Sequence, residues 1–296
     1  MAAWKNLRMI SSIVAGTGAG LSAYYYQRLR EPENVVHNAW PVYNTPVSEG
    51  AIWDTNWDCR EPKSCVRPIK NDTPQEQNRY NNEMEKMRVK ATRHIVLIRH
   101  GQYLDTGKHD KDHHLTELGK LQAMYTGKRL HELGITWDKI IVSTMTRAQE
   151  TSEMILKEIE YDPEKVRHCP YLREGAPIAP QPPISHWRPE KFQHFFQDGA
   201  RIEAAFRRYF HRASPEQEHD SHTLIIGHAN VIRYFVCRAL QLPPEAWLRI
   251  NINHGSITWL TIRPSGNVSI HHLGETGYMP ADMLSHRIPR ELKNVV

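Results

Sequence analysis

The sequence predicts an α/β fold with a doubly wound, mostly parallel sheet, helices on both faces and antiparallel edge strands. Three apolar runs lie between helical patterns and indicate buried parallel strands: residues 94–98, 139–143 and 223–227. Two more strand patterns, residues 256–262 and 268–273, flank the turn at residues 264–267 and predict a closing hairpin.

Helix start signals separate these strands. Thr116 is a candidate N-cap for a helix that begins after Leu115, because a threonine hydroxyl can accept a hydrogen bond from a free amide of the first turn. Further helices are expected to begin near Thr146, after Pro189 and after Asn230.

A helical pattern also precedes the sheet in residues 75–92. Its apolar residues recur at helical spacing: Tyr80, Met84, Met87 and Ala91. The pattern predicts a solvated amphipathic helix, with a helix that caps the domain or contacts a partner as the alternative.

Composition is that of a globular protein, with 296 residues, 40% hydrophobic and 24% charged. The formal charge of +5 is mild and the basic residues are scattered, so nucleic-acid binding is disfavoured. Four cysteines without CxxC spacing, Cys59, Cys65, Cys169 and Cys237, indicate a reducing environment rather than a disulfide framework.

Residues 1–30 are expected to form an N-terminal membrane anchor. Residues 9–26 carry no charge, and eighteen residues at about 1.5 Å each nearly span a hydrocarbon core of roughly 30 Å. Four basic residues and no acid flank this run, which favours a retained mitochondrial signal anchor; the alternative is a cleavable targeting segment.

Residues 31–92 read as a linker, rich in Pro, Asn, Glu and Lys. Within it, the segment WDTNWD, residues 53–58, places Trp53 and Trp57 four residues apart, so both indoles could project to one side of a turn. Large aromatics in a polar linker need a surface to dock on. Two surfaces are open: the chain's own domain, or a neighbouring subunit.

Charged residues follow three of the predicted strands. Arg99, His100 and Gly101 follow the first, Arg147 the second, and His228 the third. Ligands of open α/β sheets bind beyond the carboxyl ends of the strands, so these residues are expected to share one rim. Guanidiniums grip anions and a neutral imidazole is a nucleophile, a combination that suits a phosphoryl group.

Glu174, at the bend after Leu172, is the candidate acid for a leaving oxygen. The helix expected after Asn230 adds unpaired amides to the same rim. Alone, Glu174 would be read as a solvated loop residue, and each histidine as a satisfied strand-end side chain. Their coincidence with arginines at strand exits favours a phosphoryl site.

Five motifs occur in the order typical of the histidine phosphatase superfamily, phosphoglycerate mutase branch: LIRHGQY, LTELGKLQA, STMTRAQET, LREGAP and IIGHANVIR. The chain resembles that superfamily across residues 93–280, which leaves 281–296 as a C-terminal tail. The resemblance implies His100 as the nucleophile, Glu174 as the general acid, and Arg99, Arg147 and His228 as the phosphate pocket, with His228 also catalytic. It implies no metal and no cofactor.

Further segments resemble a mitochondrial subgroup of serine/threonine protein phosphatases, namely WDTNWD, REGAPIAPQPPISHW, DGARIEAAFRRYFHRA and GETGYMP. This resemblance implies an outer-membrane location, phosphoprotein substrates, a stress-activated MAP kinase kinase kinase as a partner, and a homo-oligomer. Its multimerisation residues would be Trp53, Asp54, Asn56, Trp57 and Asp58. Thr55 stands where the subgroup has proline, which predicts a looser bend and weaker assembly.

Three functions remain open. A phosphoprotein phosphatase is favoured. A small-molecule phosphatase or residual mutase would share the active centre, but the loop 104–115 lacks the Trp-bearing sugar-phosphate contacts of mutases, and Gln102 replaces their usual acidic residue. A membrane scaffold with weak activity has no need of all five site residues.

Overall fold

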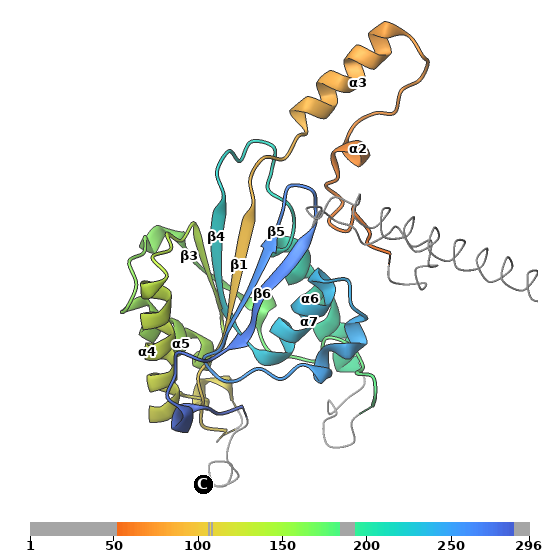
Figure 1. The fold of residues 1–296 in the computed structure, drawn as a ribbon. Coiled ribbons are helices and arrows are strands. Elements are labelled where there is room, and N and C mark those ends of the chain that lie inside the picture. The colour runs from red at the N-terminus through yellow and green to blue at the C-terminus, as the bar shows by residue number, and fades with distance from the viewer. Residues whose placement is uncertain (1–51, 106, 108, 184–192, 287–296) are drawn as a thin grey trace, which may run out of the picture. The chain divides into compact units, whose positions relative to one another are not determined.

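The computed structural model describes residues 52–105, 107, 109–183 and 193–286, and the described residues from Trp53 onward belong to one compact unit. A six-stranded sheet in the order β3-β2-β4-β1-β5-β6 forms its centre (Figure 1). The strands are β1 Arg93–Arg99, β2 Lys139–Ser143, β3 Val166–Cys169, β4 Ser221–Gly227, β5 Ile257–Ile262 and β6 Val268–Glu275.

Strands β1 to β4 are parallel to their neighbours, whereas β5 pairs antiparallel with β1 and β6 antiparallel with β5. The predicted mostly parallel sheet with an antiparallel hairpin at its edge is therefore confirmed. Strand β4 lies between β1 and β2 and is parallel to both. The carboxyl ends of β1, β2 and β4 therefore lie at the same edge of the sheet.

Helices cover both faces of the sheet, as Figure 1 shows. The covering helices are α4 Glu117–Glu132 and α5 Thr146–Leu156 on one face, and α6 Gln193–Tyr209 and α7 Ala229–Ala239 on the other. Helices α2 Pro62–Cys65 and α3 Pro74–Lys86 precede the sheet and contain no buried residue. Alternate residues of β1 separate two cores: Ile95 and Leu97 pack with α6 and α7, whereas Val96 and Ile98 pack with α4 and α5. The central strands are therefore buried on both faces of the sheet, which explains why their sequences are continuously apolar.

Most of the predicted starts are close to the observed ones. The Thr116 hydroxyl accepts a hydrogen bond from Gly119 N at 3.0 Å and caps α4, as its threonine predicts. The fourth of these helix starts was expected after Asn230, but α7 begins at Ala229 with His228 at the N-cap position. The start expected after Pro189 falls within residues 184–192, which lie outside the described residues.

Five short 3₁₀ turns complete the described elements: Asp110–Asp112, Pro163–Lys165, Pro170–Leu172, Pro244–Arg249 and Ala281–Met283. The helix predicted in residues 75–92 exists but ends at Lys86. Ala91 lies beyond it, buried in the approach to β1, because the β-branched Val89 and Thr92 lead into the strand. No residue of α3 is buried, in keeping with a solvated helix.

Within the described part of the chain, no helix is long and apolar enough to cross a bilayer. The expected anchor at residues 9–26 lies outside those residues.

Candidate active site

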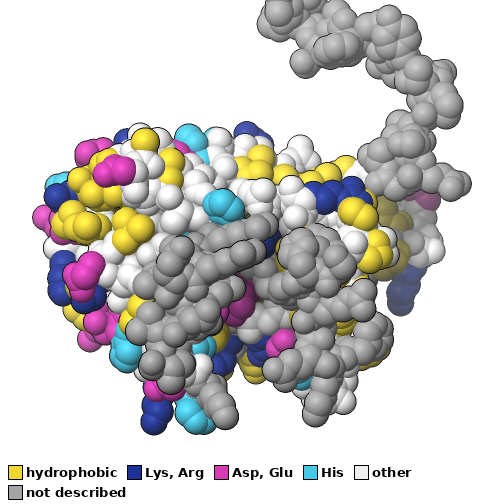
Figure 2. Space-filling view, turned by 90° about the horizontal axis from the view of Figure 1, so that it is seen from below, with side chains coloured by type: hydrophobic (Ala, Val, Ile, Leu, Met, Phe, Trp, Pro, Cys, Tyr) yellow, Lys and Arg dark blue, Asp and Glu magenta, His cyan; other side chains and the backbone are white. Residues whose placement is uncertain are grey.

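Residues from three strand exits and one loop converge at the carboxyl edge of the sheet. One nitrogen each of His100 and His228 and one carboxylate oxygen of Glu174 lie within 4.8 Å of one another. The two imidazole rings have centroids 5.1 Å apart. Figure 2 looks toward this end of the domain, where histidine, basic and acidic side chains share the surface. The structure thus brings together side chains that are up to 128 residues apart in the sequence, at the edge of the sheet where the sequence predicts a shared rim.

His100 has one imidazole nitrogen fixed as a donor and the other as an acceptor. Nδ1 lies 2.8 Å from Gly101 O, and because a carbonyl oxygen only accepts, Nδ1 carries the proton. Nε2 is left with a lone pair, which accepts a hydrogen bond from Arg147 Nε at 3.3 Å. Burial, reinforced by the positive charge of Arg147, holds the pKa of His100 well below its ordinary value. A neutral imidazole with an unprotonated Nε2 is the form that attacks phosphorus.

His228 is fully buried at the N-cap position of α7. Its Nε2 lies 2.8 Å from Ser143 Oγ, the last residue of β2. Because Met145 N also donates to that hydroxyl, at 3.4 Å, the arrangement favours a Ser143 O–H donating to Nε2 and a proton on Nδ1. Nδ1 is buried and has no hydrogen-bond partner within the described residues, which suits an anion oxygen.

Two arginines supply the charge of the site. Arg99 is 8% exposed and Arg147 is 4% exposed. Burial, with the nearby charge of Arg233, lowers the pKa of Arg99 to about 10, so its guanidinium is still charged at neutral pH. Arg99 Nε and Arg147 Nη1 are buried without a hydrogen-bond partner in the described part of the chain. With His228 Nδ1, these donors define an anion pocket, the name used below for Arg99, Arg147 and His228.

Glu174 stands beside this pocket, in the loop after the 3₁₀ turn Pro170–Leu172. Its Oε1 accepts hydrogen bonds from Asn230 N at 3.2 Å and from Gly175 N at 3.4 Å. Burial raises the pKa of Glu174, and this effect exceeds the opposing charges of Arg147 and Arg99. A raised pKa favours the protonated carboxyl, which is the form that can deliver a proton to a leaving oxygen.

The backbone after β1 is held by close packing against α4. A Cβ at Gly101 would lie 2.4 Å from Gly119 O, so only glycine fits there. Gly101 N donates to Thr151 Oγ1 at 3.0 Å, and His100 N donates to Gly227 O at 2.9 Å. The turn that carries His100 is therefore tied to α5 and β4.

Three further residues of the site were not predicted for it. His254 is 1% exposed, and its Nε2 lies 2.8 Å from Arg99 Nη2. Tyr103 packs edge-on against the His100 ring, with Arg147 over its face at 4.6 Å. Asp110, in the 3₁₀ turn Asp110–Asp112, lies with its Oδ1 3.6 Å from Arg147 Nη1. The RHG motif gave a signal for Tyr103, whereas His254 follows no strand and had none.

His100, Glu174 and His228 are also a donor set that could hold a metal ion. Arg99 and Arg147 surround this set with positive charge, which favours an anion over a cation in the same space. A metal-independent site stays a prediction.

A model described as the histidine phosphatase superfamily, branch 1, matches residues 95–275. The chain belongs to this superfamily. The serine/threonine-protein phosphatase Pgam5, mitochondrial, of Drosophila virilis is 67% identical over 290 residues, covering 98% of this chain and 100% of that protein. The protein of the same name from Drosophila melanogaster is 65% identical with the same coverage. A phosphoglycerate mutase structure from Plasmodium falciparum is 33% identical, covers 64% of this chain and 96% of that one, and has a TM-score of 0.44.

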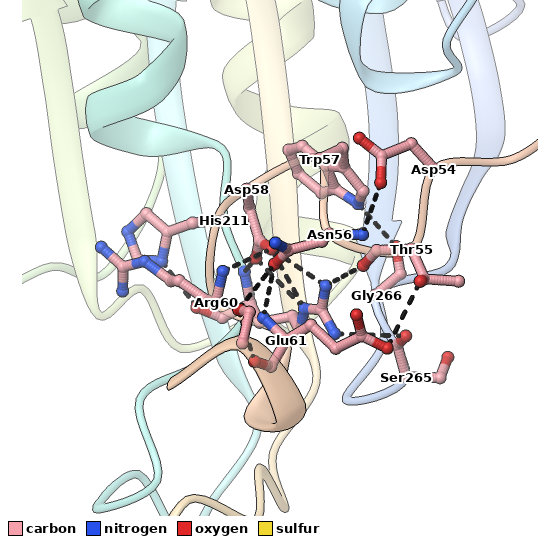
Figure 3. A network of polar contacts seen from close by, with 12 residues as sticks. Asp54, Thr55, Asn56, Trp57, Asp58, Arg60, Glu61, His211, Ser265 and Gly266 are labelled. Atoms are coloured by element: carbon pink, nitrogen blue, oxygen red, sulfur yellow. Dashed lines mark hydrogen bonds and ion pairs between the residues drawn. The ribbon is translucent and has the colours of Figure 1, made fainter. Parts of the chain in front are cut away.

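The WDTNWD segment precedes the matched histidine phosphatase region yet packs against it (Figure 3). Trp57 Nε1 donates to Gly266 O at 2.8 Å, and its ring packs on Phe206 at 6.0 Å between centroids. Asp58 pairs with Arg212 at 3.0 Å, both side chains being almost fully buried. Of the two docking surfaces left open by the sequence, the structure shows the chain's own domain.

The other residues of the segment make lighter contacts. Asp54 N donates to Gln241 Oε1 at 2.8 Å, and Asn56 Oδ1 accepts from Glu61 N at 3.0 Å. Thr55, in place of proline, donates from Oγ1 to Glu61 Oε1 at 3.3 Å, and its carbonyl accepts from Arg212. The role of Trp53, Asp54, Asn56, Trp57 and Asp58 in multimerisation stays a prediction.

Proposed function

We propose that this histidine phosphatase is a serine/threonine protein phosphatase that acts through a phosphohistidine intermediate. The observation that carries the proposal is the buried, neutral His100, whose Nε2 faces an anion pocket with a proton donor beside it. The class of substrate is supported by the two Drosophila relatives named as serine/threonine-protein phosphatases, which are 65% and 67% identical over 98% of the chain.

The reaction has two steps. His100 Nε2 attacks phosphorus in line, the bond between phosphorus and the serine or threonine oxygen breaks, and Glu174 gives its proton to that oxygen. Water then attacks the phosphohistidine while the Glu174 carboxylate takes a proton from it, and the nitrogen–phosphorus bond breaks to release phosphate. Throughout, the anion pocket stabilises the charge on the non-bridging oxygens.

Replacement of the nucleophile tests the chemistry. We expect His100→Ala to abolish phosphate release from phosphoserine and phosphothreonine peptides and to abolish acid-labile labelling of the protein by a radioactive phosphoryl donor. His168→Ala, an exposed histidine on β3, is the matched control and should behave as wild type. Unchanged turnover by His100→Ala would discard the mechanism.

A substrate comparison separates the phosphoprotein phosphatase from its rivals. The purified chain is assayed side by side on phosphopeptides, phosphoglycerate and a sugar bisphosphate. We expect the highest kcat/KM on phosphopeptides. Higher turnover of the small molecules would support a small-molecule phosphatase or mutase, and no turnover of any ester would support a scaffold.

Location and assembly are further parts of the proposal. The Drosophila relatives are named as mitochondrial, which supports a mitochondrial location. Residues 9–26 would tether the protein to a mitochondrial membrane. The WDTNWD segment would promote assembly. We expect Trp53→Ala to reduce both the oligomer size and the phosphopeptide rate. Tyr161→Ala is the control, because Tyr161 is a 39% exposed aromatic in the loop between α5 and the 3₁₀ turn Pro163–Lys165. Equal size and equal rate in Trp53→Ala would remove that role.

A further inference from the structure

The C-terminal segment 279–286 lies against the active site and connects to Arg99 through two side chains. Arg99 Nη2 donates to His254 Nε2 at 2.8 Å, because a guanidinium has no acceptor. The proton of the neutral His254 ring is therefore on Nδ1, which donates to Ser285 Oγ at 2.9 Å. We propose that His254 and Ser285 are positioning residues that orient Arg99 for phosphate.

The backbone holds this connection on both sides. His254 N donates to Ser285 O at 2.8 Å, and Arg99 Nη1 donates to His286 O at 3.1 Å and to Ile252 O at 2.7 Å. Both terminal nitrogens of Arg99 are thus engaged by the protein, and only its Nε is buried without a partner in the described residues. The orientation of that Nε toward an anion is set by the residues that hold the two terminal nitrogens.

Helix α4 fixes the segment from the other side. The side chain of Gln122 is fully buried, accepts from Gln102 N at 2.9 Å, and donates to Ser285 Oγ at 2.9 Å and to Met283 O at 2.7 Å. The Ser285 hydroxyl oxygen therefore accepts from both Gln122 and His254. A serine that joins a helix to an arginine of the anion pocket belongs to the site, although it lies beyond the family match that ends at residue 275.

The turn that carries His254 is built for this placement. Gly255 has φ +71°, a left-handed conformation, and a Cβ there would lie 2.7 Å from Met279 Cε. Its carbonyl accepts from Thr126 Oγ1 and Tyr278 O–H, each at 2.7 Å, and its N–H donates to Arg99 O at 3.0 Å. The turn is consequently locked to α4, to β1 and to the chain leading to the C-terminal segment.

Conservative and disruptive variants of each residue test the proposal. Ser285→Ala removes the hydroxyl and Ser285→Thr keeps it. His254→Asn keeps a donor near Nδ1 but loses the acceptor for Arg99, whereas His254→Gln can place an amide oxygen near Nε2. Ser269→Ala on β6, which removes an exposed hydroxyl bonded to Arg263, is the matched control.

Three readouts are measured on the full chain: kcat/KM for p-nitrophenyl phosphate, the inhibition constant for inorganic phosphate, and Tm with and without phosphate. We expect Ser285→Ala to lower kcat/KM and to weaken phosphate inhibition by about 3- to 10-fold, and to reduce the phosphate-induced rise in Tm. We expect His254→Asn to lower kcat/KM and to weaken phosphate inhibition by about 10- to 100-fold. Ser285→Thr, His254→Gln and Ser269→Ala should stay within about 3-fold of wild type.

Two results would overturn the proposal. One is a Ser285→Ala variant with wild-type kcat/KM and phosphate inhibition. The other is an equal loss in Ser285→Ala and Ser285→Thr together with a lower Tm in the absence of phosphate, which would mark a merely structural segment. The inference rests on the proposed function only through the place of Arg99 in the anion pocket. Should wild type hydrolyse no ester, the proposed function fails, while phosphate-induced changes in Tm still decide the role of Ser285.

Discussion

The ion pair between Asp58 and Arg212 makes the WDTNWD segment part of the folded domain, and this can be measured. The side chain of Asp58 is 0% exposed and that of Arg212 is 1% exposed. Arg212 N donates to Asp58 Oδ2 at 2.8 Å and Nη2 donates to Oδ1 at 3.0 Å. Burial opposes ionisation, but the hydrogen bonds and charge of Arg212 outweigh it and hold the pKa of Asp58 below its ordinary value.

Removal of either partner leaves a charge or donor buried without compensation, which costs about 3–5 kcal/mol. Because the free energy of unfolding of a domain is about 5–15 kcal/mol, we expect Asp58→Asn and Arg212→Met each to remove about a fifth or more of the stability. The double variant should lose clearly less than the sum of the two, since it leaves no lone charge. Asp54→Asn in the same segment is the control, because Asp54 is exposed and its carboxylate accepts a local hydrogen bond from Asn56 N.

The assay is urea unfolding of the purified chain, followed by tryptophan fluorescence at several pH values. A carboxyl whose folded pKa is lowered contributes stability above its unfolded pKa of about 3.9 and loses that contribution as pH falls through the folded value. The acid loss of stability should therefore be shallower in Asp58→Asn than in wild type. Equal unfolding free energies for Asp58→Asn and Asp54→Asn, or strict additivity with Arg212→Met, would refute the reasoning.

Two further changes act on the active site directly. Gly101→Ala should destabilise the domain by about 1–3 kcal/mol and abolish turnover, because its Cβ would meet Gly119 O at 2.4 Å; Gly277→Ala, with no atom within 4 Å, is the neutral control in the same unfolding and activity assays. Glu174→Gln should lower kcat/KM on phosphoserine peptides by about 10²- to 10⁴-fold. Wild-type kcat/KM should fall as pH rises through the raised pKa of Glu174, and a pH profile of Glu174→Gln that keeps this limb would assign it to another group.

The parts of the fold that the sequence predicts are those with strong local patterns. Continuous aliphatic runs identified β1, β2 and β4, and the charged residues at their exits could then be placed on one rim by topology alone. Strand β3 was missed because Val166–Cys169 is short, and Arg167 and His168 on it are exposed, as edge strands allow.

The parts that escaped prediction depend on contacts between distant segments. His254 follows an irregular stretch, and only the pairing of β5 with β1 brings it to Arg99. Ser285 lies in a tail with no periodic pattern. Trp57 and Asp58 gave a docking signal, but the surface they use, including Gly266 in the β5–β6 hairpin, is defined only once that hairpin folds. A sequence pattern therefore identifies reactive side chains at strand ends more readily than it identifies the residues from distant segments that hold them in place.

The charge balance of the site leads to a last prediction about stability. Arg99 has a pKa of about 10 and remains charged at neutral pH. Burial lowers the pKa of His100 and of His228, which favours their neutral forms, and burial raises the pKa of Glu174, which favours its protonated form. Asp110 lies 3.6 Å from Arg147 Nη1, but no carboxylate of the described residues forms an ion pair with Arg99. The buried positive charge of the anion pocket is therefore incompletely balanced by the protein, and a phosphate anion relieves that imbalance in the folded state only.

Phosphate at 100 times its dissociation constant should stabilise the fold by about 2.7 kcal/mol, which corresponds to a rise in Tm of roughly 5–11 °C for a chain of this size. The measurement is a thermal melt in phosphate against sodium chloride of matched ionic strength, since screening alone would act in both. Arg147→Met should reduce the difference between the two salts, because it removes a guanidinium whose buried Nη1 has no hydrogen-bond partner in the described residues. If phosphate and chloride raise Tm equally in wild type, the site does not concentrate positive charge on a bound oxyanion, and the role of its arginines in catalysis would have to be rejected with it.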